Sequence, residues 1–144
     1  HFSGGRRKTT FSVGGWNILP LTCYDLRFPC WSMNSYDEGS YHYDLLLYLA
    51  NWPAGRSYHW RSLLVARAIE NQAFVIGVNR TGIDGNGIDH AGDSMVIDSY
   101  GNIINDAGNK PECVIEATLH GQRMAEYRKK FFIAPDWDNI GRQG

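Results

Sequence analysis

The sequence between residues 43 and 80 constrains the fold more than any other part of the chain. Two apolar runs, "YDLLLYLANW" (43–52) and "AFVIGVNR" (73–80), have the continuous hydrophobicity of strands that are buried on both faces. The residues between the two runs have a helical pattern. A strand, a helix and a strand in succession indicate an α/β architecture.

The intervening helix is predicted to run from Ser57 to about Gln72. Trp60, Leu64 and Ala68 recur every fourth residue and form one apolar face. Ser57 is expected to be the N-cap, because its side chain can accept a hydrogen bond from a free N–H of the first turn.

The remaining segments complete a mixed sheet. Thr9–Val13 and Trp16–Thr22 are predicted strands about a Gly–Gly turn, and Pro20 favours an edge position or a strand end. Residues 81–93 have the glycine and aspartate content of a turn or a long loop. The other expected elements are one or two helical turns within 27–40, a hairpin over 94–108, a strand over 111–119, a helix over 120–132 and an irregular tail.

Composition argues against several classes of protein. The 144 residues suffice for one ordinary domain, and a net charge of −1 with one short basic cluster at 5–8 gives no sign of nucleic-acid binding. No apolar run approaches the roughly 20 residues of a membrane span. Three scattered cysteines argue against a disulfide framework and for a reducing, cytoplasmic setting, and no cysteine or histidine spacing indicates a metal site.

Cys23 is the candidate nucleophile because it follows a predicted strand. Ligands of open α/β sheets bind outside the carboxyl ends of the strands. There Cys23 can present its sulfur to a crevice, with the backbone N–H of Tyr24 directed at a developing oxyanion. The alternative is a small buried hydrophobe, which is the expectation for Cys30 and Cys113. The segments expected to converge at this edge are Cys23–Arg27, Asn51–Arg56 and Asn79–Gly82.

The groups that would activate Cys23 are not marked by the sequence. A Cys–His enzyme needs a histidine beside the sulfur, and the pattern places none there. Asp25 and Arg27 are expected to pair and fix the turn. Arg67 and Glu70, three positions apart on the predicted helix, are also expected to pair. The five histidines are His1, His42, His59, His90 and His120.

Three longer motifs make the pattern specific. They are "LTCYDLRFPCW", "YDLLLYLANWPAGRSYHWRSLLVARAIENQAFVIGVNRTG" and "HAGDSMVIDSYGNII". In this order and spacing they resemble the carbon–nitrogen hydrolase (nitrilase) superfamily, most closely its ω-amidase-like branch, from about Phe2 to Trp137. The resemblance implies an α/β fold for residues 1–144: a single, partial domain that forms the C-terminal half of a nitrilase-type αββα sandwich, with a mixed β-sheet and helices on one face.

The resemblance also implies a mechanism. Family members cleave amide or nitrile C–N bonds with a Cys, a Glu and a Lys, and no cofactor is implied. By position, Cys23 is the nucleophile and Tyr24 supplies the oxyanion N–H. The family's Glu and Lys normally precede the cysteine, but the 22 residues before Cys23 contain no glutamate, and Lys8 does not lie in the family's lysine motif.

The sequence opens on His1 rather than Met. We therefore expect the N-terminal half of the fold to be a partner, as a separate, cleaved or otherwise absent polypeptide, and this chain alone to be inactive. A half-sandwich leaves a sheet face open, which invites association. Full units are expected to form a homo-oligomer through the 57–72 helix and the C-terminal tail.

The expected substrate is a small carboxylated amide such as 2-oxoglutaramate. Arg56 or Arg80 would hold its far carboxylate, and Trp52 would wall the pocket. Two other interpretations stay open: a catalytically inactive nitrilase-fold fragment that serves as a structural or interaction subunit, and a Cys–His hydrolase of unrelated fold.

Overall fold

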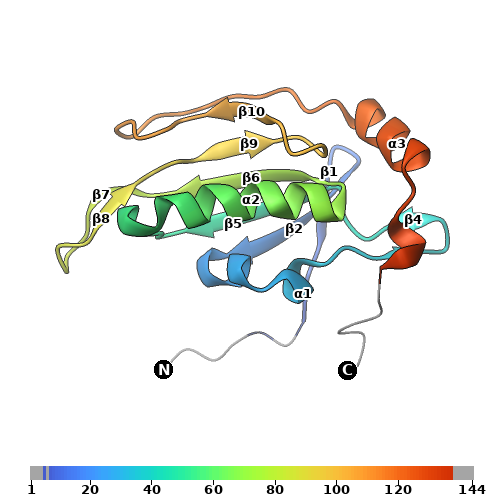
Figure 1. Ribbon diagram of the computed structural model, residues 1–144, viewed down its shortest axis with the longest axis horizontal. Coiled ribbons are helices and arrows are strands. Elements are labelled where there is room, and N and C mark those ends of the chain that lie inside the picture. Colours follow the sequence, from blue (N-terminus) through green and yellow to red (C-terminus); the bar gives the residue numbers. More distant parts are fainter. Residues whose placement is uncertain (1–4, 6, 138–144) are drawn as a thin grey trace.

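The computed structural model describes residue 5 and residues 7–137. Its centre is one six-stranded sheet with the strand order β1-β2-β5-β6-β9-β10 (Figure 1). These strands are β1 (Phe11–Val13), β2 (Trp16–Thr22), β5 (Leu45–Ala50), β6 (Phe74–Asn79), β9 (Met95–Ile97) and β10 (Ile103–Asp106). Two small hairpins lie outside it, formed by β3 (Tyr36–Asp37) with β4 (Ser40–Tyr41) and by β7 (Thr81–Ile83) with β8 (Asp89–Ala91).

The sheet is mixed, as predicted. β2, β5 and β6 are parallel, whereas β1, β9 and β10 pair antiparallel with their neighbours. Pro20 interrupts no ladder, because β1 pairs with β2 only as far as Ile18 and leaves an edge beyond it. The helical elements are η1 (Cys23–Arg27), α1 (Pro29–Ser32), η2 (Ala54–Arg56), α2 (Ser57–Asn71), α3 (Gly121–Lys130) and η3 (Ala134–Asp136).

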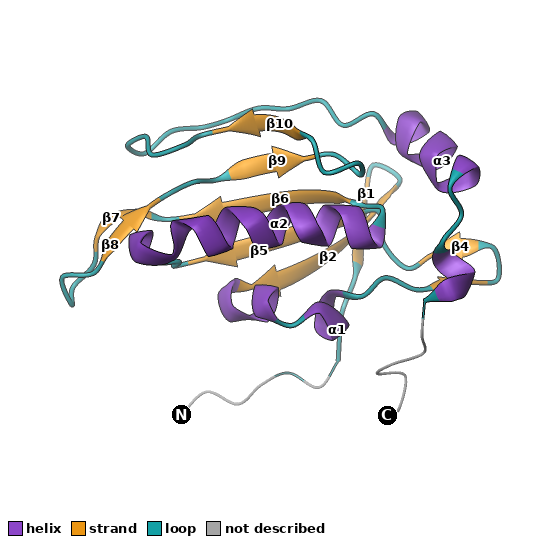
Figure 2. Ribbon diagram, in the orientation of Figure 1, coloured by secondary structure: helices purple, strands orange, loops and turns teal. Residues whose placement is uncertain are grey.

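α2 packs lengthwise on one face of the sheet, with α1 on the same side (Figure 2). The predicted apolar face is confirmed, since Trp60, Leu64 and Ala68 are fully buried. Gly77 of β6 permits the close approach of the helix. A Cβ at this position would lie 2.4 Å from Leu64 Cδ1 and 2.9 Å from the Trp60 ring.

α3 lies at the amino ends of the parallel strands. Its Met124 joins a second apolar cluster with Leu45 and Phe74. Arg128 fixes the helix more specifically, because its guanidinium donates to the backbone carbonyls of Gln72 and Tyr43 and pairs with Asp44 at 2.8 Å. These bonds tie α3 to the residues that lead into β5 and β6.

The other face of the sheet remains open along its carboxyl-terminal part. Leu49 is 51% exposed and Val78 is 44% exposed, and Pro20 on β2 is also exposed. Leu47 and Ile76, which share this face by alternation, are partly buried. The apolar surface expected of a half-sandwich is therefore present.

Several local predictions were wrong. Residues 111–119 form no strand, because a strand needs a neighbour with which to exchange backbone hydrogen bonds. Val114 in this segment is 88% exposed. Residues 81–93, expected to be a turn or a long loop, contain the turn of the β7–β8 hairpin, but the two short strands that flank it were not predicted. The N-cap of α2 is Arg56, and Ser57 instead donates its hydroxyl to Asp93.

The predicted hairpin over 94–108 and the helix within 120–132 are confirmed. In the part of the chain that the structure describes, no helix is long and apolar enough to cross a membrane. His1, Arg6 and the tail after residue 137 lie outside the described residues.

Candidate active site

Cys23 begins the turn that follows β2. It is the first residue of η1, and its backbone is left-handed, with φ at +39°. For a residue with a Cβ this conformation costs roughly 1–2 kcal/mol, so the surroundings must hold it there. The side chain is partly exposed and packs on the edge of the main core. Cys23 is thus neither fully buried nor free on the surface.

Asp25 stabilises the turn from within. Its Oδ2 accepts a hydrogen bond from the backbone N–H of Thr22 at 2.9 Å, which bridges the two residues on either side of Cys23–Tyr24. The N–H of Tyr24, the second residue of the short helix, has no acceptor within that helix. It is therefore available to an oxyanion formed at Cys23.

Arg27 connects the turn to the next loop. The prediction that Arg27 pairs with Asp25 is wrong: among the described residues, the guanidinium of Arg27 contacts His59 and Trp52 instead. Its Nη2 lies 3.2 Å from Nδ1 of His59, and its guanidinium carbon lies 5.0 Å from the centre of the Trp52 ring. The predicted pair of Arg67 and Glu70 is confirmed at 2.9 Å.

Trp52 is 3% exposed and packs against Trp60. Its indole N–H donates to the carbonyl of Arg56 at 2.8 Å. Asn79 at the end of β6 exchanges hydrogen bonds with the Trp52 backbone at 2.7 and 3.1 Å and also donates to the Gly92 carbonyl. The segments predicted to converge at the carboxyl ends of the strands are therefore physically linked.

A cavity of about 400 Å³ lies beside these loops on the open face. Arg80 and Lys110 place two cationic groups on its wall, whereas Arg56 is exposed outside it and Trp52 is not among its lining residues. Two strand spacings, about 10 Å, separate the ends of β2 and β6. The cavity lies at the β6 side of that separation, and no residue of the Cys23–Arg27 turn is among the described residues that line it. Further lining residues include Asn51, Thr81, Glu112 and Cys113.

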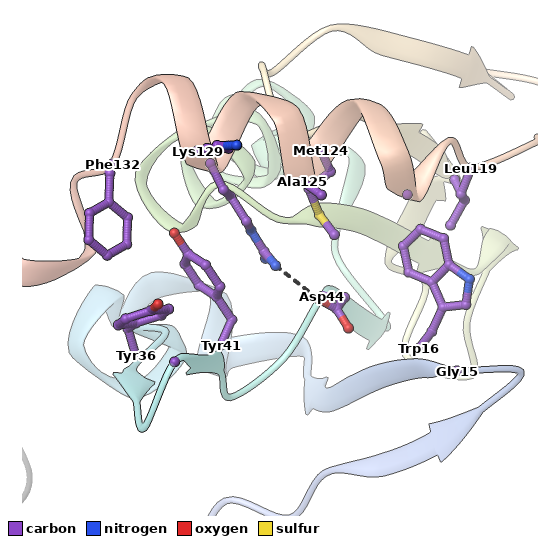
Figure 3. Close-up of a pocket in the computed structure, with 13 residues that line it drawn as sticks. Gly15, Trp16, Tyr36, Tyr41, Asp44, Leu119, Met124, Ala125, Lys129 and Phe132 are labelled. Carbon is purple, nitrogen blue, oxygen red and sulfur yellow. Dashed lines mark hydrogen bonds and ion pairs between the residues drawn. The ribbon is translucent and has the colours of Figure 1, made fainter.

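A larger cavity of about 880 Å³ lies elsewhere (Figure 3). Aromatic side chains are among its lining residues, and Asp44 and Arg128, which form an ion pair at 2.8 Å, line it as well. Although larger, it lies at the amino ends of the parallel strands, away from the Cys23 turn. The smaller cavity is therefore the candidate site. The lining aromatic residues of the larger one are Trp16, Tyr36, Tyr41 and Phe132.

The described residues give Cys23 no hydrogen bond or ion pair with a carboxylate, ammonium or imidazole group.

Burial raises the pKa of Tyr48, a core residue within electrostatic reach of Arg67, to about 12, so this phenol stays neutral. Within residue 5 and residues 7–137, no cluster of three or more acidic, histidine or cysteine side chains is arranged to hold a metal ion.

Two expectations about the site need correction. Cys30 and Cys113 are exposed rather than packed, because 111–119 is not a sheet strand and α1 is a single turn at the surface. Asn79 was expected at this edge as the first residue of Asn79–Gly82, and its hydrogen bonds confirm that position. Sequence reasoning missed Lys110, because nothing in "GNKPE" marked it.

Comparison with known proteins identifies the family. Residues 1–129 match the family model for carbon-nitrogen hydrolase. Omega-amidase YafV of Escherichia coli strain K12 is 51% identical over 139 residues, which are 96% of this chain and 51% of that protein. The 2-oxoglutaramate amidase of Bacillus subtilis is 36% identical over 136 residues, which are 94% of this chain and 51% of that protein.

Structural comparison agrees. XC1258 of Xanthomonas campestris, described as a CN-hydrolase superfamily protein with an arsenic adduct in its active site, superposes with a TM-score of 0.92 at 42% identity, over 96% of this chain and 53% of that one. The chain thus spans about half the length of the relatives it matches. On the family model, the sequence relatives and this fold, the chain belongs to the carbon–nitrogen hydrolase family, in its ω-amidase-like branch.

Proposed function

We propose that this protein takes part in hydrolysis of the C–N bond of a linear amide, with Cys23 as the nucleophile. The observation that carries the proposal is the strained, partly exposed position of Cys23 at the carboxyl end of β2. A thiol held in this way, at the edge where α/β sheets bind ligands, is suited to attack rather than to packing.

The thiolate of Cys23 attacks the amide carbon, and the carbonyl oxygen becomes an oxyanion that accepts a hydrogen bond from the N–H of Tyr24. The nitrogen takes up a proton as the C–N bond breaks. Ammonia departs, and the acyl group remains on Cys23 as a thioester. Water attacks the thioester, releasing the carboxylic acid and regenerating the thiol.

The glutamate and lysine of the family mechanism remain to be supplied. We place them on a polypeptide that covers the open sheet face, because the apolar residues exposed there, including Leu49 and Val78, favour burial against a partner. In this account the chain without that polypeptide hydrolyses amides weakly or not at all. A cytoplasmic location, with reduced cysteines, is part of the same proposal.

The substrate we propose is a short amide with a carboxylate at its far end. Arg80 and Lys110 line the cavity nearest the carboxyl ends of β5 and β6, and these two cations outnumber the one carboxylate, Glu112, among its lining residues. The names of the ω-amidase and 2-oxoglutaramate amidase relatives support this class. Arg56, exposed and outside the cavity, is the weaker candidate.

The test is ammonia release from 2-oxoglutaramate, measured on the protein with whatever polypeptides co-purify with it. Intact-mass spectrometry of the same sample identifies those polypeptides. Turnover that disappears in Cys23→Ala, with an unchanged circular dichroism spectrum, supports the proposal. Undiminished turnover in that variant excludes Cys23 as the nucleophile.

A second function is an inactive subunit that contributes structure or contacts. The open apolar face favours it, as do Tyr58 and Ile69, which are 80% and 48% exposed on α2 and offer a surface for a second copy. Co-purification without turnover, in a sample where the partner carries both a glutamate and a lysine, distinguishes this function from catalysis.

A further inference from the structure

Arg67 is a buried cation whose ion pair does not explain its burial. Arg67 is 3% exposed overall, whereas the side chain of its carboxylate partner Glu70 is 37% exposed. The two are three residues apart on one helix, so the pair could form equally well at the surface. Removing a guanidinium from water costs several kcal/mol unless further bonds compensate.

The compensating bond runs to the Cys23 turn. Nη2 of Arg67 donates to the backbone carbonyl of Leu26 at 2.7 Å, across 41 residues of sequence. Leu26 is itself fully buried and lies in η1, three residues after Cys23. A charge-assisted hydrogen bond of this length is among the stronger ones in proteins.

The helix end of this connection is rigid. Trp60, Leu64 and Ala68 bury the same helix against the sheet, and Asn71 donates to the Arg67 carbonyl at 2.9 Å while accepting the N–H of Asn34 at 2.8 Å. Arg67 therefore joins a fixed helix to a turn whose first residue is strained.

We propose that Arg67 is a positioning residue for Cys23: its bond to the Leu26 carbonyl holds η1 in the conformation that presents the thiol beside the N–H of Tyr24. The inference rests on the proposed function and adds a residue that does not touch substrate. Arginine suits the role because its rigid planar fork directs Nη1 at Glu70 and Nη2 at the Leu26 carbonyl at the same time.

The test is alkylation by chloroacetamide under native conditions, on the protein with its co-purifying polypeptides, followed by digestion and mass spectrometry of each cysteine peptide. Exposed Cys30 and Cys113 serve as internal references. In the unmodified protein Cys23 is expected to react faster than either. Arg67→Met is expected to lower the ratio of the Cys23 rate to the Cys30 rate at least fivefold, and to lower kcat for amide hydrolysis with little change in KM.

Two control variants separate positioning from general destabilisation. Arg128→Met removes another buried arginine that bonds backbone carbonyls and a carboxylate, but at the far end of the sheet. Glu70→Gln removes the ion pair and leaves the Leu26 bond. Both are expected to keep the Cys23 ratio within twofold of the unmodified protein.

An unchanged ratio in Arg67→Met, or an equal fall in Arg128→Met or Glu70→Gln, overturns the inference while leaving Cys23 as the nucleophile. If Arg67→Met does not fold, Arg67→Leu, which also removes the donor to the Leu26 carbonyl, takes its place, and an unchanged ratio there has the same meaning. Equal reaction of all three cysteines in the unmodified protein contradicts the proposed function and, with it, this inference.

Discussion

The guanidinium of Arg27 lies 5.0 Å from the centre of the Trp52 ring and so joins the turn of the candidate nucleophile to the loop after β5. The same guanidinium meets His59 on α2 at 3.2 Å. One side chain thus links η1, the loop after β5 and the first turn of α2. Arg27 therefore connects the loops around the site, whereas the cations Arg80 and Lys110 line the cavity itself.

This contact predicts a stability effect. Arg27→Met is expected to lower the free energy of unfolding by about 1 kcal/mol, the typical contribution of a partly exposed cation–π contact. Urea unfolding monitored by tryptophan fluorescence measures it. Arg123→Met, at an exposed position of α3, is the matched control and should change stability by less than about 0.5 kcal/mol. Equal losses in both variants would show that the Trp52 contact contributes nothing of its own.

Gly77 provides a test of the helix–sheet packing. Gly77→Ala places a Cβ within 2.4 Å of Leu64 and should destabilise the protein by about 1–3 kcal/mol, as overpacked cores do. Gly85→Ala, where no atom lies within 4 Å of the added Cβ, is the control. Thermal unfolding of both variants checks the difference, and a normal melting temperature for Gly77→Ala contradicts the observed packing.

The main elements of this fold were predictable because their signals are local. The runs that became β5 and β6 and the four-residue repeat that became α2 depend only on neighbouring residues. The prediction of a strand over 111–119 was wrong because a strand also depends on a partner, and no described strand pairs with these residues. Similarly, sequence spacing identified Arg67 with Glu70 but could not indicate Leu26, which is brought to it only by the tertiary fold.

The same limit applied to the site. The position of Cys23 after a predicted strand, together with the family motifs, was enough to identify it as the candidate nucleophile. The pairing of Asp25 with Arg27 seemed natural from their separation, yet a short helix directs the two side chains apart. Lys110 lines the cavity from a loop without regular secondary structure, so no periodic pattern in the sequence indicated its position.

The Arg61–Asp106 pair predicts a pH dependence. Hydrogen bonding from Arg61 is the main cause that lowers the pKa of Asp106. Because the folded pKa lies below the unfolded one, the pair stabilises the protein fully above the unfolded value, about 3.9, and this stabilisation is lost as pH falls through the folded pKa.

Asp106→Asn should therefore be less stable than the unmodified protein at pH 6, with the difference shrinking below about pH 4. Urea unfolding across pH 3–7 checks this expectation. Arg61→Gln removes the partner and should show the same trend. A difference that stays constant across this range would rule out the charged pair as its source.

The Arg80 side of the cavity predicts substrate selectivity. Arg80→Ala should raise KM for 2-oxoglutaramate about tenfold, equivalent to about 1.4 kcal/mol, and leave KM for butyramide within about twofold. Arg56→Ala, outside the cavity, should affect both substrates little. Steady-state ammonia release by the unmodified protein and both variants, with each of the two substrates, measures the six KM values. Equal losses for the carboxylated and the neutral amide would count against a carboxylate site.

The most direct test of the central claim is to trap the acyl-enzyme. The protein, with its co-purifying polypeptides, is mixed with 2-oxoglutaramate and quenched in acid within one turnover. It is then digested, and the masses of the cysteine-containing peptides are measured by mass spectrometry. The account predicts an acyl group on the peptide that contains Cys23 and none on those of Cys30 or Cys113. Ammonia release with every Cys23 peptide unmodified, or with the acyl group on another residue, would contradict it.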